Sequence, residues 1–266
     1  MPSGIITLLT DFGTADAFVG TMKGVILGIN RDVQIVDLTH AVPPQQILPA
    51  ALILRSAVPF FPTRTTHVAV VDPGVGSTRR PIVIEAEAGY LVGPDNGVLS
   101  LAAAAVGRRQ VRVIDNAQCF RHPVSQTFHG RDIFAPAAAH LAGGGAAEVL
   151  GPPIESIVEL TVPAPTDTAY GLHGEVIHID HFGNLLTNID AGALARFTVQ
   201  GVSVSINGEA VAGPVNAYAA VPEGTPLAIV GSWGVVEIAV RNGSAAETFA
   251  AGLGTPVTVA VESRNP

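Results

Sequence analysis

Cysteine and lysine are almost missing from this 266-residue sequence, which contains one of each, Cys119 and Lys23. A single cysteine cannot form a disulfide within the chain, which is typical of proteins in reducing compartments. The other basic residues are arginines without a long run, and the net charge is −8. Because binding to duplex nucleic acid needs a basic face, we expect no nucleic-acid partner, although a local basic pocket for small anions stays open.

The sequence also lacks long hydrophobic runs. No apolar stretch reaches the roughly 20 residues that a membrane-spanning helix needs. The first residues, MPSGIITLLTDFG, have no basic segment, and Asp11 interrupts their apolar run, so we expect no signal peptide. These absences predict a cytoplasmic protein with no membrane partner.

Aromatic residues make up only 5% of the chain, whereas hydrophobic residues make up 48%. The core must therefore be built from alanine, valine, isoleucine and leucine. The 29 glycines and 20 prolines are spread along the chain, which predicts many turns in a folded protein and not a disordered one.

The first 160 residues alternate between apolar runs typical of strands and segments with apolar residues at helical spacing. Expected strands are 4–10, 33–38, 67–71, 82–87, 90–92 and 111–114, and expected helices are 15–30, 46–57, 98–106 and 132–141. Strands that alternate with helices at this pitch are typical of βαβ units. The pattern predicts an α/β N-terminal domain, residues 1–160, with a largely parallel sheet.

The sequence changes character after residue 160. Residues 161–171, TVPAPTDTAYG, contain two prolines and little periodicity, so we expect a linker. Short strands are expected beyond it, at 172–180, 185–188, 202–206, 227–230, 235–240 and 257–261. The pairs Asn207-Gly208 and Asn242-Gly243 are typical of hairpin turns. Residues 172–266 are therefore predicted to form a small all-β, barrel-like C-terminal domain.

The tetrapeptide TDFG, residues 10–13, follows the first expected strand. In open α/β sheets, ligands bind at the carboxyl ends of the strands. Asp11 and Asp16 flank a turn at this position, where a carboxylate can accept hydrogen bonds from ribose hydroxyls. The alternative for Asp16 is a residue in the first turn of the next helix, where its charge complements the helix dipole.

The stretch DPGVGSTRR, residues 72–80, follows another expected strand. It lacks the lysine and the spacing of a phosphate-binding loop. Pro73 favours an extended conformation for Asp72, so its side chain can point off the strand end, and the glycines allow a tight return. Asp72 and Arg79 can meet across this turn, either in a functional site or as a structural salt bridge. Arg80 is expected to face solvent.

His129 lies just ahead of an expected helix, beside Gly130. A histidine there can be partly exposed and can titrate near neutral pH, although it can equally be an ordinary loop residue. Arg131 and Asp132 are interpreted as a local pair and helix cap.

His178, Asp180 and His181 could ligate a metal ion. No further histidine or cysteine cluster with matching spacing accompanies them in the sequence, so we expect no metal site. The tripeptide FGN at 182–184 is more typical of a ligand-binding turn. The segment GSWG at 231–234 joins two late strands and contains the only tryptophan of the sequence.

Seven segments, spread over nearly the whole chain, resemble in their order one family: the S-adenosylmethionine hydroxide adenosyltransferases, relatives of fluorinase and chlorinase. The segments are LTDFGTADAFVG (9–20), VDLTHAVPP (36–44), VVDPGVGSTRR (70–80), GPDNGVL (93–99), FHGRDIFAPAAAHLA (128–142), IDHFGNLLTNI (179–189) and GSWGVVEIAVRNG (231–243). The resemblance implies an α/β N-terminal domain and a β-barrel C-terminal domain. It also implies a homotrimer whose active sites lie between the N-terminal domain of one subunit and the C-terminal domain of the next.

The chemistry implied by the resemblance takes place at the 5′ carbon of S-adenosylmethionine. Water or hydroxide displaces methionine in an SN2 step, which gives adenosine and L-methionine, and the catalytic residues are Asp72, Arg79 and His129. A sulfonium already leaves well, so the difficulty lies in the nucleophile. His129 could take a proton from water, Arg79 could stabilise hydroxide character, and Asp72 could orient either of them; His129 could also only orient the water.

The resemblance also implies a binding site for the substrate and no cofactor besides it. The matching residues are Asp11 for the ribose hydroxyls, Asp16, Asp180 and Ser232 for the methionine amino and carboxylate groups, Phe182, Asn184 and the backbone around Arg241–Gly243 for adenine, and Phe128, Tyr218 and Trp233 as further contacts.

Three departures from fluorinase favour hydroxide over fluoride. Gln45 is nearest the place of a fluorinase tryptophan, residues 81–94 are too compact for an extra fluorinase loop, and His129-Gly130 stands where fluorinase has tyrosine and serine. A chlorinase-like 5′-halogenase is an alternative because it shares the glycine, but the pairing of His129 with Arg79 argues against it. A non-catalytic protein that binds an adenosyl ligand is the other alternative.

Overall fold

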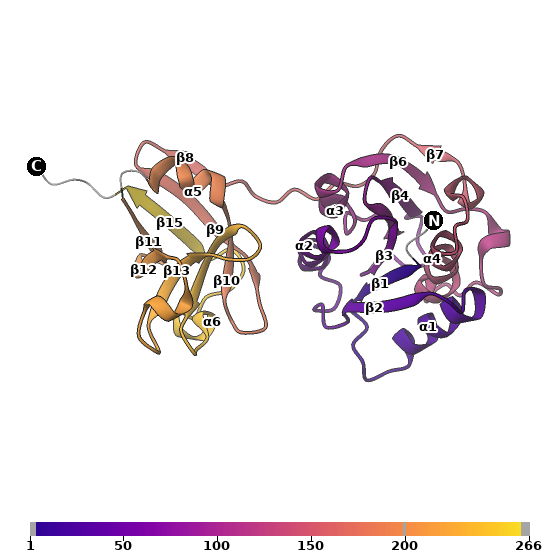
Figure 1. Cartoon of the computed structure of the whole chain (residues 1–266), viewed down its shortest axis with the longest axis horizontal. Helices are drawn as coiled ribbons and strands as arrows, with labels where there is room; N and C mark the ends of the chain where they lie inside the picture. The colour runs from indigo at the N-terminus through magenta and orange to yellow at the C-terminus, as the bar shows by residue number, and fades with distance from the viewer. Residues whose placement is uncertain (1–3, 199–200, 262–266) are drawn as a thin grey trace, which may run out of the picture. The chain divides into compact units, whose positions relative to one another are not determined.

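The computed structural model describes residues 4–198 and 201–261 of the chain (Figure 1). The chain divides into two compact units, Met1–Leu160 and Thr161–Pro266. Each unit has its own hydrophobic core, and each is described separately below.

The first unit is built on a seven-stranded sheet with the order β2-β1-β3-β5-β4-β6-β7. The strands are β1 (Ile5–Thr10), β2 (Gln34–Thr39), β3 (Thr65–Val70), β4 (Pro81–Ala86), β5 (Gly89–Pro94), β6 (Arg108–Val113) and β7 (Pro153–Ile154). The pairs β1–β2, β1–β3 and β3–β5 are parallel, whereas β4 pairs antiparallel with both β5 and β6, and β7 pairs antiparallel with β6. Only β4 and β7 therefore run against the common direction, and the predicted mostly parallel sheet is confirmed.

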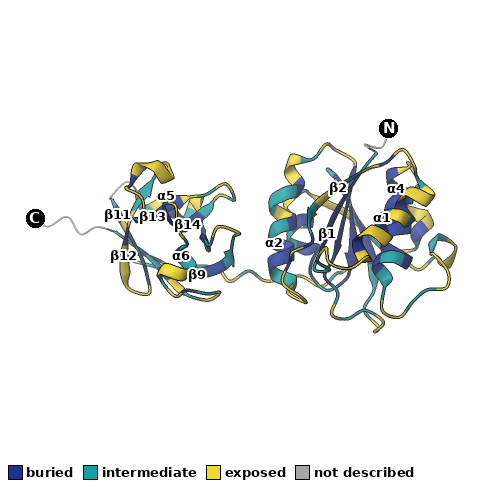
Figure 2. Ribbon diagram, turned by 90° about the horizontal axis from the view of Figure 1, so that it is seen from below, coloured by how far each residue is buried: buried dark blue, intermediate teal, exposed yellow. Residues whose placement is uncertain are grey.

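Helices cover both faces of this sheet (Figure 1). They are α1 (Phe18–Ile29), α2 (Ile47–Ala57), α3 (Ser100–Ala105) and α4 (Ala135–Ala142). Side chains alternate across a strand, so β1 supplies Ile6 and Leu8 to the core beneath α1 and α4, and Leu9 to the core beneath α2 and α3. Figure 2 shows the result as a buried sheet between helices whose outer surfaces are exposed. Burial on both faces explains why β1 and the end of β3, residues 68–70, read as apolar runs.

The second unit is a closed β-barrel. Its strands are β8 (Thr166–Thr168), β9 (Gly171–Ile179), β10 (Leu185–Asp190), β11 (Val202–Ile206), β12 (Glu209–Val215), β13 (Pro226–Val230), β14 (Val235–Val240) and β15 (Pro256–Val261). Their order is β10-β14-β13-β12-β11-β15-β9-β8, and an additional β9–β10 pairing closes seven of them into a ring, with β8 paired outside the ring to β9. The short helices α5 (Ala191–Thr198) and α6 (Ala245–Thr248) contact the strands of the barrel. The predicted barrel-like domain is confirmed.

Several boundaries differ from the sequence-based expectations. The segment expected to be a linker, 161–171, contains β8, which pairs with β9 as a short edge. The helix expected at 132–141 begins at Ala135, because a π-helical turn, Gly130–Phe134, precedes it. Strand β12 and helix α5 were not expected at all. Among the described residues, no helix combines the length and apolar character needed to cross a bilayer.

Candidate functional site

A cavity of about 410 Å³ lies at the carboxyl end of strands β1 and β3. This edge of an α/β sheet is where ligands are generally bound. Four segments contribute to it: those that follow β1, β2 and β3, the last being the DPGVGSTRR loop, and the segment around His129. The cavity is lined by Asp11, Phe12, Phe18, Pro44, Gln45, Val70, Asp72, Pro73, Val75, Thr127, Phe128, His129 and Gly130.

The DPGVGSTRR loop turns back through its own hydrogen bonds. The backbone N–H groups of Val75 and Ser77 donate to the carbonyls of Asp72 (3.2 Å) and Gly74 (3.1 Å). Gly76 has φ +77°, and a Cβ at this position would lie 2.4 Å from the carbonyl oxygen of Gln126. Only glycine allows this approach, which packs the loop against the segment that leads to His129.

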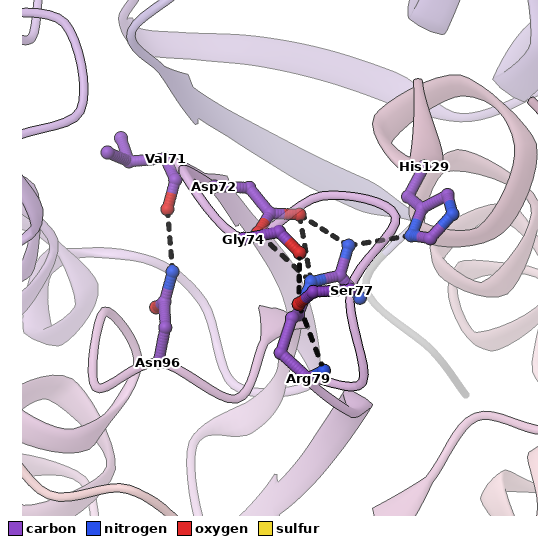
Figure 3. A network of polar contacts seen from close by, with 7 residues as sticks. All are labelled: Val71, Asp72, Gly74, Ser77, Arg79, Asn96 and His129. Carbon is purple, nitrogen blue, oxygen red and sulfur yellow. Dashed lines mark hydrogen bonds and ion pairs between the residues drawn. The ribbon is translucent and has the colours of Figure 1, made fainter. Parts of the chain in front are cut away.

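The loop brings Asp72 and Arg79 together, as the sequence predicted. The Arg79 Nε lies 3.0 Å from each carboxylate oxygen of Asp72, and its Nη2 donates to Oδ2 (Figure 3). The two side chains are only 5% and 9% exposed, so the ion pair is buried. The ring of Phe134 lies under the guanidinium, with 5.4 Å between the ring centroid and Cζ. The contacts with Asp72 and with the Phe134 ring together hold the Arg79 guanidinium in one orientation.

Arg79 also contacts His129, which lies 50 positions further along the chain. The distance from Arg79 Nη2 to His129 Nδ1 is 2.7 Å (Figure 3). Burial and then the positive charge of Arg79 lower the pKa of His129, while Asp72 and Asp132 partly oppose this shift. The imidazole is therefore neutral at neutral pH. Asp72, Arg79 and His129 form one hydrogen-bonded set at the cavity.

The Arg80 side chain is 40% exposed, in line with the expected solvent-facing position, but other residues also hold it. Its Nε donates to Asp95 at 2.8 Å, its Nη2 contacts the same carboxylate, and Nη2 also donates to the carbonyl of Ser156 at 2.9 Å. The adjacent arginines thus have separate roles: Arg79 contacts the cavity residues, whereas Arg80 ties the sheet to the end of the unit.

Asp11 is held at the cavity by its neighbours. The backbone N–H of Gln45 donates to Asp11 Oδ2 at 2.8 Å. Behind it, Thr10 Oγ1 lies 2.9 Å from His40 Nδ1, and His40 Nε2 lies 3.1 Å from Asp37. We did not anticipate this chain, in which Thr10 and His40 are buried and Asp37 is exposed, although His40 belongs to the quoted VDLTH segment. The contact between Thr10 and His40 holds the end of β1 in place.

Asp16 is exposed, two residues ahead of the start of α1 at Phe18, and it does not line the cavity. The alternative of a first-turn residue in α1 is wrong, because the helix starts later than expected. The rings of Phe12, Phe18 and Phe128 contact one another edge-on or tilted, with centroids 5.3–5.9 Å apart. Phe128 thus forms part of an aromatic wall of the cavity.

Arg131 and Asp132 do pair, at 2.7 and 2.8 Å, but Asp132 is fully buried within the π-helical turn and does not cap α4. Asp132 also accepts a hydrogen bond from the backbone N–H of Ser125 at 2.9 Å. These donors, together with the charges of Arg131 and Arg121, hold the pKa of Asp132 below its ordinary value in spite of burial. The pair anchors the segment that contains His129.

In the barrel, Asp180 organises the turn between β9 and β10. Its Oδ1 accepts hydrogen bonds from the backbone N–H groups of Phe182 and Asn184, both at 2.9 Å, and its Oδ2 accepts one from Asn184 Nδ2. Asn184 is buried, whereas Phe182 is 73% exposed. The turn therefore presents an aromatic face to its surroundings, in keeping with a ligand-binding turn.

A second polar cluster in the barrel contains Glu237, a residue that we did not anticipate. Its Oε1 accepts a 2.6 Å hydrogen bond from Tyr218, and a Cβ at Gly231 would lie 2.4 Å from its Oε2. Glu237 lies in β14 and is buried, and its only sequence signal is a charge at an otherwise apolar strand position. Burial, together with the charge of Asp180, raises the pKa of Glu237.

The remaining predicted residues lie at the ends of the barrel strands. Ser232 is exposed, and Trp233 stacks on His178 with ring centroids 4.8 Å apart. Arg241 donates from Nη1 to the carbonyl of Val221 at 2.7 Å, and Gly243 is exposed in the turn that follows β14. Over the described part of the chain, no three His, Cys, Asp or Glu side chains are placed to hold a metal ion.

Comparison with known proteins identifies the family. A family model described as the SAM hydroxide adenosyltransferase N-terminal domain matches residues 6–151, and its C-terminal domain matches residues 174–258. An (R)-S-adenosyl-L-methionine hydrolase of Salinispora tropica is 41% identical over 92% of this chain and 94% of its own. A protein of the same name from Thermus thermophilus is 40% identical over 95% and 98%.

More distant relatives and a solved structure complete the comparison. A fluorinase of Actinoplanes sp. is 29% identical over 70% of this chain and 71% of its own. A crystal structure of an uncharacterized conserved protein from Thermotoga maritima superimposes with a TM-score of 0.89 at 37% identity, and covers 96% of this chain and 99% of that one. Both domain models match in order, and the chain therefore belongs to the SAM hydroxide adenosyltransferase family.

Proposed function

We propose that the protein hydrolyses S-adenosyl-L-methionine to adenosine and L-methionine, by attack of a water-derived nucleophile on the 5′ carbon. The observation that carries the proposal is the hydrogen-bonded Asp72–Arg79–His129 set at the cavity, in which the ion pair is buried and the histidine partly exposed. Membership of the family and the names of relatives about 40% identical to this chain support it.

The geometry suits this reaction because the difficult partner is the nucleophile. Bulk water has a pKa near 15.7, whereas the sulfonium needs no acid in order to leave. Arg79 provides a fixed positive charge near the cavity, and low exposure strengthens its effect on an anionic oxygen. Asp72 holds Arg79 in a single orientation through two donors. Displacement in line with the departing sulfur, an SN2 step, is part of the proposal.

Substrate contacts are assigned from both units. In the first unit, Asp11 would bind the ribose hydroxyls and Phe128 would pack on the ligand. In the second, the exposed ring of Phe182 would stack on adenine. The other candidates keep the roles that the resemblance gives them: Asp16, Asp180 and Ser232 at the methionine end, Asn184, Arg241 and Gly243 at adenine, and Tyr218 and Trp233 as further contacts. We propose a cytoplasmic homotrimer with active sites between subunits and no cofactor.

Oxygen-18 water gives the decisive test. Turnover of S-adenosylmethionine in labelled water should place one label at O5′ of adenosine, and an unlabelled product would contradict water attack. A parallel reaction with added chloride addresses the halogenase alternative, which predicts a 5′-chloro nucleoside. Tight binding without turnover over hours would favour a non-catalytic protein.

A further inference from the structure

We propose that His129 serves the reaction as a hydrogen-bond donor through its Nε2–H, and not as the base that deprotonates water. The inference deepens the proposed function, on which its catalytic part rests. It starts from the hydrogen bond between Arg79 and His129, because the chemistry of arginine fixes the direction of that bond.

A guanidinium group has only N–H donors and no acceptor, and it keeps its charge at every working pH. The 2.7 Å contact between Arg79 Nη2 and His129 Nδ1 therefore requires a lone pair on Nδ1. A neutral imidazole with a lone pair on Nδ1 carries its proton on Nε2. The structure thus assigns the tautomer of His129 without reference to substrate.

Arg79 cannot easily turn away to release Nδ1. Its Nε contacts both oxygens of Asp72, its Nη2 contacts Asp72 as well as His129, and its guanidinium lies over the ring of Phe134. Protonation of Nδ1 would point an N–H group at the N–H group of a fixed cation. For Nε2 to take a proton from water, Nδ1 would have to carry the ring proton, which would break this contact; the imidazolium then formed would place two positive charges side by side.

The Nε2 edge remains for the ligand. Among the residues that the structure describes, no side chain or backbone group hydrogen-bonds to His129 Nε2, and His129 lines the cavity. In Figure 3 this edge of the ring points away from Arg79. An N–H donor in this place stabilises an oxygen that carries negative charge.

The step balances without a protein base. A water molecule loses one proton to bulk solvent, and the resulting hydroxide is held by the Nε2–H of His129. A lone pair of the hydroxide forms the O–C5′ bond while the electron pair of the C5′–S bond passes to sulfur. The products are the 5′-hydroxyl of adenosine and the neutral thioether of methionine, and His129 keeps its proton throughout.

The tautomer can be measured directly on the full chain without substrate. In protein labelled with ¹⁵N histidine, at a pH where His129 is neutral, its Nδ1 should have the chemical shift of an unprotonated nitrogen and its Nε2 that of an N–H. His129→Ala identifies the signals. A protonated Nδ1 would overturn the proposal, whatever the enzyme does with S-adenosylmethionine.

A pair of variants tests the catalytic part. The side-chain amide of His129→Gln can donate a hydrogen bond from near the Nε2 position but cannot act as a base, whereas His129→Ala does neither. We expect the single-turnover rate of the glutamine variant to stay within about tenfold of wild type and that of the alanine variant to fall by about 10²–10³-fold, as for a lost oxyanion donor. Equal, large losses in two variants with unchanged melting temperatures would overturn the donor role and restore general-base catalysis. If the wild-type protein does not hydrolyse the substrate at all, the proposed function fails, while the tautomer assignment is still decided by NMR.

Discussion

The hydroxyl of Tyr218 donates a 2.6 Å hydrogen bond to Oε1 of Glu237 and so ties a 3₁₀ turn, Tyr218–Ala220, to strand β14 of the barrel. The carboxylate is buried, and its pKa is raised above 4.5 by burial and by Asp180, although the Tyr218 bond lowers it. A raised pKa means that folding favours the protonated acid. Glu237 therefore contributes less to stability as the pH rises through its folded-state pKa.

Glu237→Gln should stabilise the barrel relative to wild type at neutral pH, because glutamine keeps an acceptor for Tyr218 and removes a buried charge. The difference in melting temperature should shrink as the pH falls towards 4.5 and below. Tyr218→Phe is the matched control, since it leaves the carboxylate without its donor and should destabilise by about 1–3 kcal/mol at pH 7. Calorimetric melting between pH 4 and 8 checks both variants, and a difference that does not depend on pH would contradict the assignment.

Arg79→Lys should abolish most activity while Arg80→Lys does not. Lysine keeps the charge but cannot contact Asp72 and His129 together, so we expect a loss of about 10²–10³-fold in turnover. The Arg80 variant should turn over at a rate close to wild type and lose about 1 kcal/mol of stability, because it gives up a hydrogen bond to Asp95 or Ser156. Steady-state kinetics and urea unfolding separate the two effects. Similar activity losses in both variants would argue against a distinct role for Arg79.

His67 should make the stability of the first unit depend on pH. It is buried beside Thr7, whose Oγ1 lies 2.8 Å from its Nδ1, and burial lowers its pKa to about 4. Between about pH 4 and 6.5 the unfolded chain binds the proton that the folded chain rejects, so stability falls as the pH falls through this window. The difference amounts to about 3 kcal/mol, from 1.36 kcal/mol per pKa unit.

The titration of His67 is measured by NMR of its ring protons, and the stability by urea unfolding at several pH values. His67→Gln is the control, because it should flatten this part of the pH dependence. A midpoint near 6.5 would mean that the ring is exposed to water.

Gly76→Ala tests why the DPGVGSTRR loop contains glycine, and Gly20→Ala in α1 is its control. Gly76→Ala forces a left-handed residue to carry a Cβ 2.4 Å from the carbonyl of Gln126, so it should destabilise the unit and lower activity together. Gly20→Ala lies in α1 with open space around its Cβ, and should be neutral or stabilising by up to about 1 kcal/mol. Melting temperatures that move in opposite directions are the expected result; unchanged activity in the Gly76 variant would show that the loop tolerates displacement.

Periodic and local features of the sequence predicted much of the fold. The apolar runs that became β1 and the end of β3 are buried on both faces. The helical spacing of Phe18, Met22, Val25, Ile26 and Ile29 predicted α1. Met22 and Ile26 are buried in it, whereas Phe18 and Ile29 are exposed. Strand β12 was missed because its sequence, EAVAGPV, contains Gly213 and Pro214 and lacks a clear alternation. The π-helical turn has the composition of an ordinary helix start, so nothing local distinguishes it.

In the candidate site, too, the sequence predicted a contact between residues close in sequence and missed contacts between distant ones. Asp72 and Arg79 were predicted to meet because a tight turn separates them by seven positions. The partners of Arg80 and Glu237 lie 15 or more positions away, and no local pattern indicates a contact set by tertiary packing. His40 was overlooked because its contact with Thr10 joins positions 30 residues apart, although its other neighbour, Asp37, is only three positions away.

The π-helical turn after His129 has a consequence for the register of the chain. A π turn contains one residue more than an α turn, which in effect is a single-residue insertion at the start of α4. Removal of one residue from Gly130–Phe134 would restore a regular helix and rotate everything before it by about 100° around the helix axis. Such a rotation would carry the imidazole away from Arg79. The partnership of these two side chains thus depends on the length of the chain between His129 and α4 as much as on their identities.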